Sequence, residues 1–112
     1  MELKYNEYLI RLHDKFSVVK GTKFKIDNLQ FGISKTGEVD FWNKNAWVVT
    51  ELTTGLKITD GRTRVGAKSN IINNKELRNK ITEMLNDDKT NEGKLIQEAK
   101  QKLKEYLELN RE

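Results

Sequence analysis

The sequence predicts an α+β fold with an N-terminal helix, a small three- to four-stranded antiparallel meander sheet and C-terminal helices. Residues 22–60 carry short alternating apolar runs between turn residues, which is typical of antiparallel strands. Residues 2–16 and 63–110 carry apolar residues at spacings of three and four, which is typical of amphipathic helices. With 112 residues, the chain has the length of a single domain, residues 1–112.

The N-terminal helix is predicted from one apolar stripe. Tyr5, Leu9, Leu12 and Phe16 follow the i, i+4, i+7, i+11 spacing, and the charged residues between them fall on other faces. Lys20-Gly21 then has the composition of a turn. We therefore expect a helix over residues 2–16.

The sheet is predicted from alternating residues that share a face. These residues are Phe24 and Ile26; Leu29, Phe31 and Ile33; Val39 and Phe41; and Trp47, Val49 and Glu51. The phase breaks at Asp27-Asn28, which indicates a bulge or a tight turn. Thr53-Thr54-Gly55 is a further turn, after which the extended pattern resumes up to Asp60-Gly61. We expect the core to contain Phe31, Trp47, Leu52 and Ile58.

The C-terminal part is predicted to be helical. Thr63 has the side chain of an N-cap residue, and Asn73 or Asn74 caps the next helix. The apolar face of that helix consists of Leu77, Ile81, Met84 and Leu85. Thr90 or Asn91 begins the last helix, whose stripe is Ile96, Ala99, Leu103 and Tyr106.

Basic residues are concentrated in the first part of the chain. The net charge is +4, and residues 1–70 carry 12 Lys and Arg against 8 Asp and Glu, whereas the remainder is balanced. Such clustering is what an anion-binding face requires, although a solvated surface also explains it. Because Trp42 stands beside Asn43 and Lys44, we expect an exposed aromatic there. The candidate binding residues are Lys20, Lys23, Lys25, Trp42, Lys44, Arg62, Arg64 and Lys68.

Two basic clusters flank the predicted sheet: Lys15, Lys20, Lys23 and Lys25 on one side, and Arg62, Arg64 and Lys68 on the other. In a meander the first and last strands are usually opposite edges, so we expect two separate patches. The segment from Gly61 to Lys68 also invites comparison with the phosphate-binding loop G-x-x-x-x-G-K-[ST]. Gly61 and Gly66 are correctly spaced, but Ala67 intervenes before Lys68, so the lysine comes one residue too late to meet a phosphate.

Nothing in the sequence supports catalysis. The chain has no cysteine and one histidine, His13, and no acid cluster stands at ligand spacing. Nucleophile–base pairs are therefore improbable, and we expect a non-enzyme that needs neither a metal nor a cofactor. No apolar run of about 20 residues is present, so we expect no membrane span, and a cytoplasmic location is the default.

The stretch from Trp47 to Arg64 consists of a Trp-led strand, a Thr-Gly turn, a short strand and Gly-x-Thr-Arg. It resembles small proteins of phages and mobile elements. The size, lack of cysteine and Asn/Lys-rich composition are similar to anti-CRISPR proteins. This resemblance implies a non-enzymatic binding protein that inhibits or modulates a host nucleoprotein, most concretely a CRISPR-Cas nuclease with its guide RNA. The alternative is a general nucleic-acid-binding module that contacts RNA or DNA through its basic surface.

Overall fold

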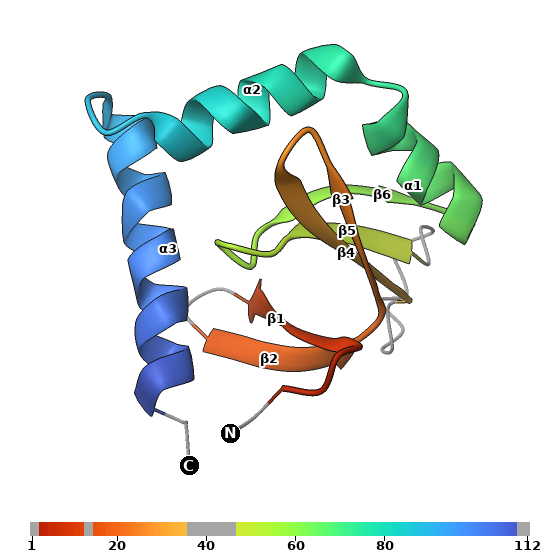
Figure 1. Ribbon diagram of the computed structural model, residues 1–112, viewed down its shortest axis with the longest axis horizontal. Coiled ribbons are helices and arrows are strands. Elements are labelled where there is room, and N and C mark those ends of the chain that lie inside the picture. The colour runs from red at the N-terminus through yellow and green to blue at the C-terminus, as the bar shows by residue number, and fades with distance from the viewer. Residues whose placement is uncertain (1–2, 13–14, 36–46, 110–112) are drawn as a thin grey trace.

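The described part of the chain forms six strands in two antiparallel sheets, followed by three helices (Figure 1). The computed structural model describes residues 3–12, 15–35 and 47–109. The strands are β1 (Glu7–Leu12), β2 (Lys15–Lys20), β3 (Thr22–Ile26), β4 (Leu29–Lys35), β5 (Trp47–Glu51) and β6 (Lys57–Gly61). The helices are α1 (Arg64–Ile72), α2 (Lys75–Asn86) and α3 (Asn91–Leu109).

The predicted N-terminal helix is wrong, because β1 and β2 form an antiparallel hairpin in its place. Leu9 lies opposite Val18, and Tyr8 lies opposite Val19. The β-branched pair Val18-Val19 favours a strand, and pairing with β1 satisfies the backbone hydrogen bonds of both segments. Tyr5, which a helical stripe would bury, is 91% exposed, whereas Tyr8 and Leu9 are both buried.

The second sheet is a meander in the order β3-β4-β5-β6. Of the bulge and the tight turn that the sequence left open at Asp27-Asn28, the structure has the tight turn, since these residues have φ values of 53° and 69° and Ile26 pairs with Leu29. Two consecutive positive φ values are characteristic of a two-residue type I′ hairpin. The strand predicted around Val39–Trp42 lies outside the described residues.

One face of the meander packs against helices and holds the main core. Phe31, Ile33 and Val49 project from β4 and β5, and they pack with Ala67, Ile71 and Ile81 of α1 and α2. Of the predicted core residues, Phe31 is fully buried. Trp47 and Ile58 are partly buried against this cluster, and Leu52 is also only partly buried.

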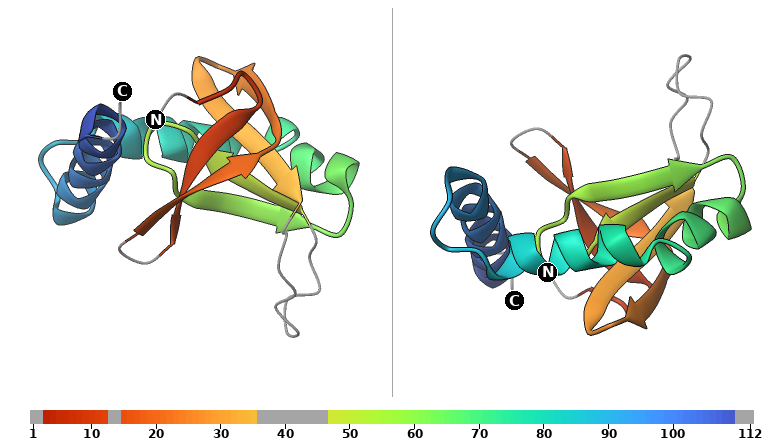
Figure 2. Two further views of the ribbon diagram at one scale, coloured as in Figure 1. Left: turned by 90° about the horizontal axis from the view of Figure 1, so that it is seen from below. Right: turned by 90° about the horizontal axis from the view of Figure 1, so that it is seen from above.

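The opposite face of the meander is covered by the β1–β2 hairpin (Figure 2). Tyr8 of β1 packs directly over Gly32, where a Cβ atom would lie 2.4 Å from the outermost ring carbon. A similar approach occurs at Gly21, which joins β2 to β3 and would place a Cβ atom 2.8 Å from the Tyr8 hydroxyl. The two glycines therefore allow the hairpin to lie close to the sheet.

The turn between β5 and β6 is held by a buried carboxylate. Glu51 is 1% exposed and accepts hydrogen bonds from the backbone N–H groups of Thr53 (2.8 Å) and Thr54 (2.9 Å). Gly55, at φ 75°, follows in this turn and accepts a 2.7 Å hydrogen bond from the backbone N–H of Arg11 in β1. The turn thus links the two sheets, and Glu51 has a structural role.

The helices begin at the predicted polar caps. The side chain of Thr63 accepts a hydrogen bond from the Gly66 N–H at the start of α1. Asn74 accepts one from the Leu77 N–H at the start of α2. Thr90 accepts one from the Gly93 N–H at the start of α3. Each bond satisfies a donor that the first helical turn leaves free.

Candidate functional site

Helix α1 brings together the two basic segments that the sequence separates. The Arg64 guanidinium donates a 2.9 Å hydrogen bond to the Thr22 hydroxyl of β3. One helical turn later, the Lys68 ammonium lies 5.0 Å from the centroid of the Phe24 ring, also on β3. The expectation of two separate patches is therefore wrong: α1 follows β6 in the chain and crosses the sheet to reach the opposite edge strand.

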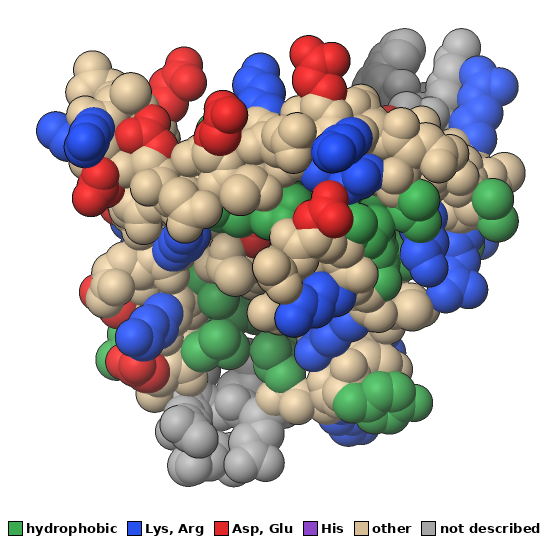
Figure 3. Space-filling model, turned by 45° about the horizontal axis from the view of Figure 1, so that its top comes forward, with side chains coloured by type: hydrophobic (Ala, Val, Ile, Leu, Met, Phe, Trp, Pro, Cys, Tyr) green, Lys and Arg blue, Asp and Glu red, His purple; other side chains and the backbone are tan. Residues whose placement is uncertain are grey.

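We call the combined region the α1–β3 basic surface. Its exposed members are Lys23 and Lys25 of β3 and Arg64 of α1, and Lys68 is half-buried. Lys20, at the end of β2, and Arg62, just before the α1 cap, are also exposed. Figure 3 shows Lys and Arg side chains gathered on the side of the molecule where α1 lies. The surface thus consists of Lys20, Lys23, Lys25, Arg62, Arg64 and Lys68.

The cations flank both sides of the β3 edge. Side chains alternate along a strand, so Lys23 and Lys25 project from the face opposite to Thr22 and Phe24. The latter two residues contact α1, which places Arg64 and Lys68 on the helix side. Successive lysines on one strand face lie about 6.7 Å apart. An extended anionic chain running along this edge would therefore meet cations from both sides.

Several acids near this surface have ion-pair or hydrogen-bond partners outside it. Asp27, at the β3–β4 turn, forms a 2.7 Å ion pair with Arg78 of α2. Asp60 of β6 forms a 2.5 Å ion pair with Lys57. Glu7 lies opposite Lys20 in the β1–β2 ladder and accepts a 2.9 Å hydrogen bond from the Lys4 backbone. These pairings limit how far the acids offset the positive field of the surface.

The start of α1 contributes to the same field. No acidic residue stands in its first turn, so the positive end of the helix dipole is not compensated there. The segment does not form a phosphate-binding loop. Gly61 packs against the backbone of Ala67, and the Gly66 N–H, which such a loop would direct at a phosphate, donates its hydrogen bond to the Thr63 side chain. Lys68 points to Phe24, away from the position that such a loop requires.

Three of the residues singled out in the sequence fall outside the described part of the chain, and two contact residues were not predicted. Trp42 and Lys44, together with His13, lie outside the described residues. Thr22 and Phe24 were not predicted as the contacts that join the surface, because only the crossing of α1 brings them near Arg64 and Lys68. No signal within a few residues of either segment could have revealed these contacts.

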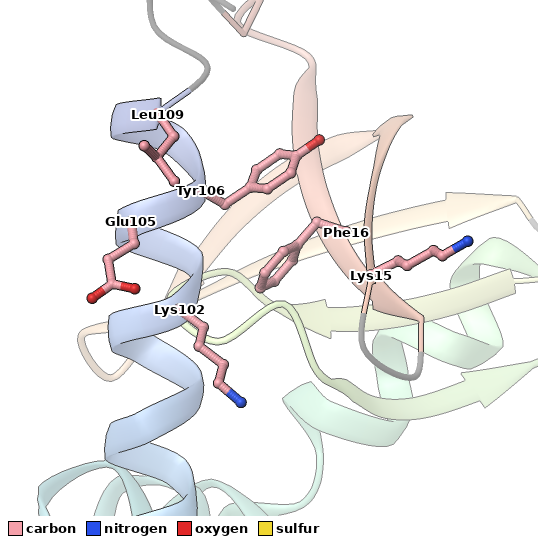
Figure 4. A pocket seen from close by; sticks show the side chains of 6 residues that line it. All are labelled: Lys15, Phe16, Lys102, Glu105, Tyr106 and Leu109. Atoms are coloured by element: carbon pink, nitrogen blue, oxygen red, sulfur yellow. The ribbon is translucent and has the colours of Figure 1, made fainter.

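An open groove lies between β2 and α3 (Figure 4). It has a volume of about 500 Å³ and is lined by Lys15, Phe16, Lys102, Glu105, Tyr106 and Leu109. The Phe16 and Tyr106 rings meet with their centroids 5.1 Å apart, which fastens α3 to the hairpin. Lys102 is paired with Glu98 at 2.9 Å. The groove brings no set of catalytic groups together among the residues that line it.

The described residues show no constellation for metal or acid–base chemistry. No group of three or more His, Asp or Glu side chains among them could hold a metal ion. A hydrogen bond from the Thr90 hydroxyl, with others from the Lys89 and Thr90 backbone, lowers the pKa of Asp87. This carboxylate therefore serves the turn before α3, as Glu51 serves the turn after β5.

No helix in the described ranges has the length and apolar character needed to cross a membrane. Comparisons with models of known families, with curated proteins and with solved structures found no match. Any functional conclusion therefore depends on the chemistry of the surface itself.

Proposed function

We propose that this chain is a non-enzymatic binding protein whose α1–β3 basic surface contacts the nucleic-acid part of a host nucleoprotein and thereby inhibits or modulates it. The joining of the two basic segments by the Arg64–Thr22 and Lys68–Phe24 contacts carries the proposal. A continuous set of cations gains more from a polyanion than two distant sets do, because one partner can meet all of them at once.

The proposal includes a cellular setting. The resemblance in type to anti-CRISPR proteins makes a CRISPR-Cas nuclease with its guide RNA the first partner to test. Such a partner acts in the cytoplasm, which is the location we propose for this chain. Inhibition would follow from occupying a nucleic-acid path on the nuclease, a role that needs binding and no chemistry.

A second candidate function is a general nucleic-acid-binding module. The placement of lysines and arginines on both sides of the β3 edge favours it, since contacts to phosphates alone suffice for binding without sequence preference. The two functions differ in one measurable respect. A module binds only nucleic acid, with strong salt dependence, whereas a nucleoprotein inhibitor also contacts the protein part of its target, so its complex persists as salt rises.

The test uses Arg62→Glu/Arg64→Glu and a matched variant, Lys89→Glu/Lys94→Glu. Both double variants change the net charge equally, and the latter pair is exposed at the α2–α3 junction, away from α1. Acids at the start of α1 suit its helix dipole, so the first variant should stay folded. Binding to a nucleoprotein from host lysate should fall at least tenfold only for the first variant.

Two treatments separate the candidate functions. Nuclease treatment of the lysate should leave protein capture intact for an inhibitor, because an inhibitor also contacts the protein part of its target, and should abolish capture for a module, which holds proteins only through the nucleic acid. For bare nucleic acid, the slope of log K against log salt should flatten by about 0.7–0.9 for each phosphate that the variant no longer neutralises. Unchanged binding of a folded Arg62→Glu/Arg64→Glu protein to every partner would show that the α1–β3 basic surface is only a solvated face.

A further inference from the structure

Tyr5 is an exposed aromatic side chain that packing does not explain. It is 91% exposed, whereas tyrosines usually bury most of their ring. It precedes β1, and the helical stripe to which the sequence pattern assigned it does not exist. A ring that remains in water is available to a ligand.

Backbone contacts place Tyr5 beside the α1–β3 basic surface. The carbonyl of the next residue, Asn6, accepts a 2.8 Å hydrogen bond from the Gly21 N–H, at the junction of β2 and β3. Lys20 precedes this junction, and Thr22 follows it and accepts the hydrogen bond from Arg64. The aromatic ring and cations from two elements therefore converge on the start of β3.

The other aromatic rings near this junction are not available for stacking. Tyr8 is buried against Gly32 on the hairpin side of the sheet. Phe24 packs on Phe31 with centroids 5.4 Å apart, and Lys68 lies over its ring. Among the described residues around the start of β3, Tyr5 is the ring that a base can reach.

We propose that the α1–β3 basic surface takes single-stranded nucleic acid, with one unpaired base stacked on Tyr5 and the adjoining phosphates on Lys20, Lys23 and Arg64. This inference rests on the proposed function and adds the strand type to it. The faces of bases within a duplex are already stacked on their neighbours, so an isolated exposed ring adds affinity only for an unpaired base. The 2′-hydroxyl plays no part, so RNA and DNA strands should both bind.

The experiment measures fluorescence anisotropy of a labelled oligothymidylate of about 12 nucleotides, alone and annealed to its complement. The proteins are the full chain, Tyr5→Ala, Tyr5→Phe and Arg62→Glu/Arg64→Glu. The single strand should bind more tightly than the duplex. Tyr5→Ala should weaken single-strand binding about fivefold or more without changing duplex binding. Tyr5→Phe should bind like the parent, because it keeps the stacking face.

Three outcomes would overturn the inference, and they differ in what they say of the proposed function. Equal or tighter duplex binding, or single-strand binding unaffected by Tyr5→Ala, would refute it, while a loss of binding in Arg62→Glu/Arg64→Glu would leave the proposed function standing. If neither oligonucleotide binds and the nucleoprotein binding is also unaffected by the arginine changes, both the inference and the proposed function fail. An oligouridylate in place of oligothymidylate checks that RNA binds in the same way.

Discussion

The contact between Tyr8 and Gly32 holds the β1–β2 hairpin against the meander, and the substitution Gly32→Ala, which adds one methyl group, tests this contact. A Cβ atom on Gly32 would lie 2.4, 2.5 and 2.8 Å from three carbons of the Tyr8 ring, whereas carbon atoms attract best at about 3.5–4.0 Å. The ring would have to withdraw by roughly 1 Å. It has little room to do so, because Tyr8 is only 3% exposed. Gly32→Ala should therefore cost about 1–3 kcal/mol of unfolding free energy.

Urea denaturation followed by circular dichroism measures this cost. The backbone at Gly32 is not in the left-handed region, so the alanine itself brings no conformational strain. The control is Tyr8→Leu, because leucine lacks the outer ring carbons that would meet the new methyl group. In the double variant Gly32→Ala/Tyr8→Leu, the cost of the alanine should disappear relative to Tyr8→Leu alone. If the two substitutions are simply additive, the hairpin does not pack on Gly32 and the two-sheet arrangement is misassigned.

Two further predictions concern the core. Burial raises the pKa of the Tyr8 phenol. Its contribution to stability is therefore fully present below the unfolded-state pKa of about 10 and is lost as the pH rises through the higher folded-state pKa. Tyr8→Phe should remove this part of the fall above about pH 10; equal losses in both proteins would contradict it. At neutral pH the same variant should be no less stable, because the buried Tyr8 hydroxyl has no hydrogen-bond partner among the described residues. Phe31→Ala should cost about 3–5 kcal/mol in urea denaturation, and more than Trp47→Ala, since Phe31 is fully buried and Trp47 only partly. A larger cost for Trp47→Ala than for Phe31→Ala would show that the core is not centred on Phe31.

The sequence by itself determined features that depend on a few neighbouring residues. Asp27-Asn28 forms the tight turn because both side chains tolerate positive φ. Thr63 and Asn74 cap their helices through hydrogen bonds that span three residues. The alternation from Trp47 to Glu51 indicated a strand, and β5 confirms it. Such features are predictable because the residues that cause them are adjacent in the chain.

Only the tertiary structure determined that the N-terminal segment forms a β-hairpin and not a helix. Residues 5–16 satisfy a helical spacing, but β1 is stabilised by pairing with β2 and by docking on the meander. Tyr8 and Leu9 are consecutive, so their side chains leave opposite faces of β1, yet both are buried; Tyr8 packs against Gly32 of the meander. The spacing of apolar residues cannot predict that a strand is buried on both faces, since burial on each face depends on which other elements cover the strand.

Packing between distant segments also explains why the candidate site could not be predicted from the sequence. The composition of the chain identified Lys23, Lys25, Arg62 and Arg64 as cations of interest, but not that they share a surface. The path of α1 across the sheet joins them, because burying Ala67 and Ile71 against β4 and β5 carries the start of the helix over to Thr22. Side-chain packing between distant segments sets the direction of α1, so the position of the basic surface can be known only from the assembled core.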